Sequence, residues 1–105
     1  MTNIQVAQAF ANGETKGQSG TMFIEGFGND RNGRYAAIYS YGYHFPIAIK
    51  ELGSNQAIFN TDGYSNTTAR HKGHVRRALE GMGFDLLQSN TQRLKSQIDH
   101  VALGR

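Results

Sequence analysis

Between residues 20 and 61 the sequence alternates short apolar runs with turn residues, and this pattern indicates a β-sheet at the centre of the fold. Residues 29–33 (Asn-Asp-Arg-Asn-Gly) form the clearest turn, because Asn32-Gly33 can supply the positive φ angles of a tight hairpin. The predicted strands are residues 20–27, 34–41, 43–51 and 56–61. The connections between them are short, so we expect an antiparallel meander.

The two ends of the chain show the period of a helix instead. The predicted helices are residues 2–12, residues 67–81 and the segment from about residue 90 to Leu103. Thr2 or Asn3 can cap the first helix, and Gly104 is the expected stop of the last. Two segments are interpreted as links: residues 14–19, which are polar, and residues 84–87, which are apolar and either extended or a turn.

These elements predict an α+β fold that spans residues 1–105 as a single domain. We expect a four-stranded antiparallel β-meander with one N-terminal and two C-terminal helices, packed on one face of the sheet. The chain has no cysteine, which excludes disulfides, zinc–thiolate sites and thiol nucleophiles. No signal peptide is visible, and no apolar run approaches the roughly 18 residues of a membrane span. A cytoplasmic protein without membrane contact is therefore expected.

A cluster of basic side chains marks the second predicted helix. Within eight residues it carries four formal cations and two histidines: Arg70, His71, Lys72, His74, Arg76 and Arg77. On a helical wheel His71 shares the apolar arc of Val75 and Leu79, which suggests a core-facing ring bonded to the sheet or to Tyr64. The other five exceed an ordinary balanced helix face, even though Glu80 can pair with a neighbouring arginine. We interpret them as a binding surface for a negative partner.

Gly73 lies inside this basic helix, where glycine costs about 1 kcal/mol relative to alanine. Close approach of another backbone, from the sheet or from a partner, is one reason to keep it.

An aromatic run follows the hairpin, and its members all have odd numbers: Tyr35, Tyr39, Tyr41, Tyr43 and Phe45. In a regular strand these rings share one face, although Gly42 can break the alternation. Such a face can stack the bases of single-stranded nucleic acid, with Tyr41 and Tyr43 as the stacking rings. The alternative is that the rings cover the core and pair across strands.

The start of the basic helix is the best candidate for a small-anion site. Free N–H groups converge there with hydroxyl and imidazole side chains: Ser65, Thr67, Thr68, His44 and His71. Ordinary helix capping is the alternative explanation. His71-x-x-His74 with His44 is a weak metal pattern among cationic neighbours, so neither a metal nor a cofactor is expected. Nucleophile and base candidates such as Ser40 and His44 show no recognisable catalytic arrangement.

Two motifs resemble those of a family of small proteins in phage and mobile-element genomes. The motifs are Tyr-Ser-Tyr-Gly-x-His-Phe-Pro-x-Ala, at residues 39–48, and Tyr-Ser-x-Thr-Thr-x-Arg-His, at residues 64–71. The resemblance covers about residues 39–79 and carries no catalytic residue. It implies an accessory protein in the cytoplasm of a host cell, of a kind that binds nucleic acid or disables a host defence complex, as anti-CRISPR proteins do.

Non-catalytic binding is therefore the expected function. In the first hypothesis Arg70, Lys72, Arg76 and Arg77 contact the phosphates of DNA or RNA, and His74 lies beside them. In the second, an anti-CRISPR-type inhibitor docks on a host defence protein complex; mimicry of nucleic acid is disfavoured because the chain is basic, with a net charge of +3. A phosphodiesterase or nucleotide-binding protein built on His44, His71 and Arg70 is the least favoured. A homodimer through an exposed sheet edge is compatible with the pattern.

Overall fold

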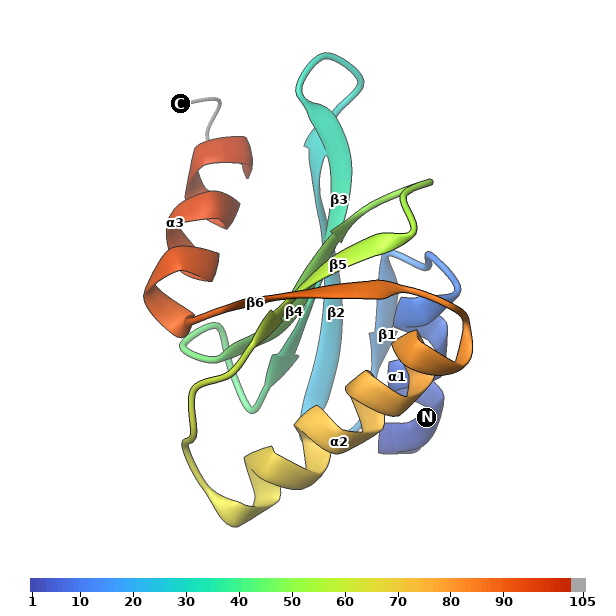
Figure 1. The fold of residues 1–105 in the computed structure, drawn as a ribbon, viewed down its shortest axis with the longest axis vertical. Coiled ribbons are helices and arrows are strands. Elements are labelled where there is room, and N and C mark those ends of the chain that lie inside the picture. Colours follow the sequence, from blue (N-terminus) through green and yellow to red (C-terminus); the bar gives the residue numbers. More distant parts are fainter. Residues whose placement is uncertain (103–105) are drawn as a thin grey trace.

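A six-stranded mixed sheet forms the centre of the protein in the computed structural model, which describes residues 1–102 (Figure 1). Its strands lie side by side in chain order: β1 (Lys16–Gln18), β2 (Met22–Asn29), β3 (Gly33–Ser40), β4 (Pro46–Glu51), β5 (Gln56–Asn60) and β6 (Asp85–Ser89). The first five strands form an antiparallel meander, whereas β6 runs parallel to β5.

The prediction of four strands is confirmed for β2–β5 but is incomplete, because β1 and β6 were both interpreted as links. β1 has three residues, too few to show an alternation. β6 follows a helix that carries the chain back along the sheet, so it pairs with β5 in parallel.

Three helices cover the sheet: α1 (Asn3–Ala11), α2 (Asn66–Gly81) and α3 (Thr91–Ala102). Thr2 and Gln5 form a reciprocal capping box at the start of α1. The Ser65 hydroxyl accepts the Thr68 N–H at 3.1 Å and caps α2. The predicted end of the last helix, at Leu103 and Gly104, lies outside the described residues. In the described part of the chain, no helix has the length and apolar character to cross a membrane.

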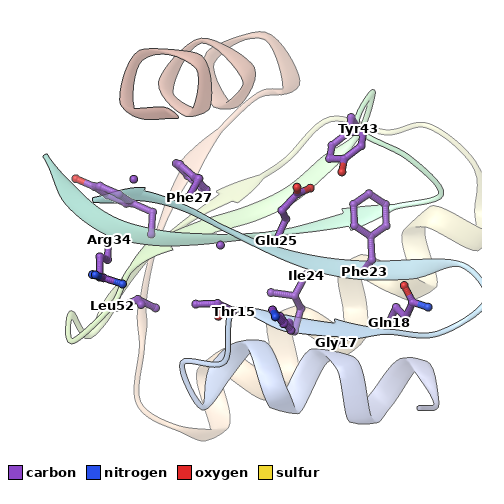
Figure 2. Close-up of a pocket in the computed structure, with 14 residues that line it drawn as sticks. Thr15, Gly17, Gln18, Phe23, Ile24, Glu25, Phe27, Arg34, Tyr43 and Leu52 are labelled. Atoms are coloured by element: carbon purple, nitrogen blue, oxygen red, sulfur yellow. The ribbon is translucent and has the colours of Figure 1, made fainter. Parts of the chain in front are cut away.

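The helices lie on both faces of the sheet, so the prediction that all three pack on one face is wrong for α3. Val6 and Phe10 of α1 pack with Val75 and Leu79 of α2 in one core cluster. Leu94 of α3 is buried in a second cluster on the other face, against Ala37, Tyr39 and Ile49. Figure 2 shows α1 and α3 on opposite sides of the sheet. The unforeseen strand β6 carries the chain to this second face before α3 begins.

The predicted hairpin turn joins β2 to β3, but only half of its expected backbone geometry is present. Gly33 has a φ of +96°, whereas Asn32 does not adopt a positive φ. The Asn29 side chain instead accepts the N–H groups of Arg31 and Asn32 at 2.9 and 2.8 Å. The turn is therefore stabilised by the side chain of Asn29, the last residue of β2.

Candidate functional site

The two sequence motifs meet where the loop after β3 packs against the start of α2. The Ser40 hydroxyl oxygen lies 3.1 Å from the Thr68 hydroxyl oxygen and 2.7 Å from His71 Nδ1. Above these buried contacts the His44 ring lies 5.5 Å from the Tyr64 ring, centroid to centroid. The fold thus brings residues that are 20 to 31 positions apart in sequence to one end of the basic helix.

His71 is a structural residue at the base of this site, with a side chain that is only 1% exposed. Its Nδ1 contacts Ser40, and its Nε2 lies 3.2 Å from the Thr21 hydroxyl oxygen. Burial, and then the neighbouring His74, lower the pKa of His71, so the ring is neutral at pH 7. Ser40 is equally buried, so a substrate cannot reach the Ser40–His71 pair. The prediction of a core-facing histidine bonded to the sheet is confirmed.

This burial corrects the predicted anion site. Thr68 and His71 face the sheet and cannot contact a solvent anion. Ser65 and His44 are exposed and Thr67 is half-buried, so these three side chains remain accessible near the start of α2.

The basic side chains of α2 form two rows on its outer side. Arg70, His74 and Arg77 lie along one flank, on which Arg77 donates to His74 Nδ1 at 3.0 Å. Lys72 and Arg76 lie along the other. The three arginines are exposed, whereas Lys72 and His74 are half-buried.

The second row is fixed in place by neutral partners. Lys72 Nζ donates to the Asp62 carbonyl at 2.7 Å, and the Arg76 guanidinium lies 4.8 Å from the centre of the buried Phe59 ring. Contacts with a carbonyl and a ring hold both side chains without cancelling their charge.

No carboxylate forms an ion pair with these cations in the part of the chain that the structure describes, although the negative charge of Asp62 partly offsets the lowering of the Lys72 pKa by burial and Arg76. The one ion pair among residues 1–102 joins Arg34 to Asp30 on the distant hairpin, at 2.6 Å. Glu80, the acid expected to pair with an arginine, forms no ion pair there. The outer side of α2 is therefore a positive surface, as the sequence predicted.

Gly73 lies on the crest of α2 between the two cationic rows. The nearest group to a Cβ atom added there would be the Arg77 guanidinium, at 3.2 Å, and not the sheet. Close approach of the sheet is therefore the wrong explanation for this glycine. Within residues 1–102 the crest is open to a partner.

Tyr41 adopts a backbone conformation that is rare for a bulky residue, with a φ of +67°. The left-handed region costs a residue with a Cβ atom about 1–2 kcal/mol. Its N–H donates to the Thr21 carbonyl at 2.7 Å, and its ring lies 5.4 Å from the His71 ring yet is 51% exposed. Retained strain of this kind concentrates at functional sites.

The aromatic run does not share one face, because the strand does not stay regular through it; the break lies at Tyr41, one residue before Gly42. β3 ends at Ser40, and the positive φ of Tyr41 breaks the alternation. Tyr35, Tyr39 and Tyr43 lie on the α3 side, whereas Tyr41 packs on His71 and Phe45 enters the core beneath α1 and α2. Tyr39 is buried, which confirms the core-covering alternative for that ring.

Tyr43 is exposed, but it belongs to a different surface from the cations of α2. Its ring lies 5.1 Å from Phe23 and 5.2 Å from Tyr39, and its hydroxyl points toward Glu25, which raises the pKa of Tyr43 (Figure 2). A shallow groove of about 790 Å³ runs past these side chains along β2. Tyr43 and the basic helix therefore lie on opposite faces of the sheet.

Tyr64, which was not predicted to be a site residue, is 64% exposed and lies directly before the cap of α2. An aromatic residue beside a capping serine inside a motif could have indicated it. Thr21 and Asn3 extend the buried polar network, because Asn3 Oδ1 accepts from the Thr21 hydroxyl at 3.1 Å. No local pattern in the sequence indicates that partnership.

Among the described residues, no three histidine or carboxylate side chains gather as metal ligands. Comparison of the chain with protein-family models, curated proteins and solved structures finds no match.

Proposed function

We propose that the protein binds nucleic acid through the outer side of α2. One observation carries this proposal: α2 presents a dense group of cations, and no carboxylate among residues 1–102 is paired with them. Arg70, Arg76 and Arg77 would contact phosphates directly, with Lys72 and His74 beside them. Unpaired cations at this density displace counterions from a polyanion, which is a main source of affinity for DNA and RNA.

Exposed rings at one end of α2 suggest how bases could take part. Tyr41 and Tyr64 are both more than half exposed, and His44 packs beside Tyr64. Aromatic rings next to a cationic track stack unpaired bases, each worth about 1–3 kcal/mol. Tyr43 is left out of this proposal because it lies on the other face of the sheet. Non-catalytic binding of this kind suits the small phage-type accessory proteins that the two motifs resemble.

The test is binding to labelled single- and double-stranded DNA and RNA at about 50 and 200 mM salt. Arg70/Arg76/Arg77→Ala is compared with Lys16/Arg31/Lys95→Ala, which removes the same formal charge from other parts of the fold. We expect the first variant to bind at least about tenfold more weakly and with a shallower salt dependence, and the control to remain near wild type.

Equal losses in the two variants would mean that net charge, and not the α2 surface, drives binding. No binding by wild type at low salt would contradict the proposal. A defence complex with an acidic docking surface would then be the partner to test.

A further inference from the structure

β6 is an edge strand with little of the usual protection against pairing, because Asp85 is its only charged residue. It is last in the order of the sheet, so in the described part of the chain no strand pairs with its outer edge. Three of its five residues are exposed, and Leu87 keeps 50% of its surface accessible. β1, at the other edge, is shorter and carries a lysine. A short strand, a lysine or a proline commonly prevents pairing between sheet edges. β6 has neither lysine nor proline.

The hydrogen bonds to β5 show which backbone groups of β6 are free. Asp85 N–H donates to the Asn55 carbonyl at 2.9 Å, and the Ser89 carbonyl accepts the Thr61 N–H at 2.9 Å. The backbone N–H and C=O groups of successive residues point to opposite edges of a strand. Those of Leu86 and Gln88 therefore point away from β5, to the free edge. Four backbone groups thus lie along the free edge.

We propose that β6 pairs antiparallel with β6 of a second copy of this chain, about a twofold axis at Leu87. In this register Leu86 forms a hydrogen-bonded pair with Gln88 of the partner subunit. By symmetry, Gln88 forms the same pair with Leu86 of the partner subunit. All four free backbone groups are satisfied. Leu87 then faces Leu87 of the partner subunit in a non-hydrogen-bonded position, where side chains approach most closely.

The side chains along this edge fit a copy of themselves. Asp85 faces Ser89 of the partner subunit in this register, so no like charges lie opposite each other. Arg93 of α3 lines the same hollow as Leu87 and Ser89, which gives the incoming carboxylate a cationic neighbour. A twofold contact requires such self-complementarity, because the same residues lie on both sides.

The twofold axis is perpendicular to the sheet, so the same face of each copy lies on the same side of the joined sheet. The dimer would have one continuous sheet of twice the width, with both α2 helices on the same side. The inference does not depend on what α2 binds.

The test is the molar mass of the full chain by sedimentation equilibrium over a range that reaches about 1 mM. Wild type should approach twice the 11.6-kDa chain mass. Leu87→Lys places two ammonium groups at the axis and should raise the dissociation constant at least about tenfold. Ile4→Lys is the matched control, because Ile4 is 52% exposed but lies on α1, so this variant should still dimerise.

Gln88→Pro gives a second, independent variant. It removes one outward N–H and leaves the β5–β6 hydrogen bonds in place, so circular dichroism should show a folded protein and sedimentation equilibrium should show a monomer. Wild type that remains at the monomer mass up to the highest concentration would overturn the proposal. A dimer that survives both Leu87→Lys and Gln88→Pro would overturn it too, since its contact would lie elsewhere.

Discussion

The Ser40 hydroxyl oxygen lies 2.7 Å from His71 Nδ1, and this hydrogen bond ties the end of β3 to the buried side of α2. The buried residues of α2 fall into two groups. Thr68 and His71, in its first half, are polar, whereas Val75 and Leu79, in its second half, are apolar. Hydrogen bonds therefore anchor the end of α2 that lies beside the exposed rings, and hydrophobic packing anchors the other end.

This arrangement predicts that His71→Ala destabilises the protein strongly. The substitution leaves a cavity in the core and removes one partner from each of the Ser40 and Thr21 hydroxyls. We expect the free energy of unfolding to fall by about 2–3 kcal/mol in urea denaturation. His74→Ala, on the outer side of the same helix, should change it by no more than about 0.5 kcal/mol. A loss below about 1 kcal/mol for His71→Ala would contradict the role of the buried network.

His71 also predicts a pH dependence of stability. Its pKa in the folded protein is depressed below the ordinary value of 6.5, so the unfolded chain binds the proton more readily. The stabilising contribution is therefore fully present above about pH 6.5 and is lost as the pH falls toward the folded pKa. The urea midpoint should fall when the pH is lowered from about 7.5 to 5.5, and this fall should be larger for wild type than for His71→Gln. Parallel losses in the two proteins would assign the pH dependence to other groups.

Most of the sheet could be predicted from the sequence because the alternation of β2–β5 and the turns between them are local features. The position of α3 could not, because it depends on β6, a five-residue strand whose pairing with β5 is set by the path of α2. The cations of α2 and the inward position of His71 were readable from helical periodicity. The separation of Tyr41 from Tyr43 was not, since it arises from one positive φ angle that no residue type at position 41 demands.

Lys50 provides a test of a buried charge that the sequence did not reveal. Its side chain is 4% exposed, donates to the Ala11 carbonyl at 3.2 Å, and lies 4.3 Å from the centre of the Phe84 ring. Burial lowers the pKa of Lys50, which means that the folded environment disfavours the ammonium form. At neutral pH this opposes folding, and stability should rise as the pH approaches 10.5, the ordinary lysine value.

Lys50→Met should therefore raise the free energy of unfolding at pH 7 by up to about 1 kcal/mol, because a thioether fills similar space without a desolvated charge. It should also flatten the rise in stability as the pH approaches 10.5. Lys95→Met, at an exposed position of α3, should have an effect within about 0.5 kcal/mol. A loss above about 1 kcal/mol for Lys50→Met would show that the contacts with Ala11 and Phe84 outweigh the cost of burial.

Substitution of Tyr41 should affect the stability of the protein and its binding of nucleic acid differently. Glycine adopts a positive φ freely, so Tyr41→Gly relieves backbone strain while removing a ring that is half exposed. We expect the free energy of unfolding to stay the same or rise by up to about 1 kcal/mol, and affinity for single-stranded nucleic acid to fall about fivefold or more. Tyr41→Phe keeps the ring and should bind as wild type does. If Tyr41→Gly is markedly destabilised, the ring contact with His71 is worth more than the strain; if its affinity is unchanged, the ring stacks no base.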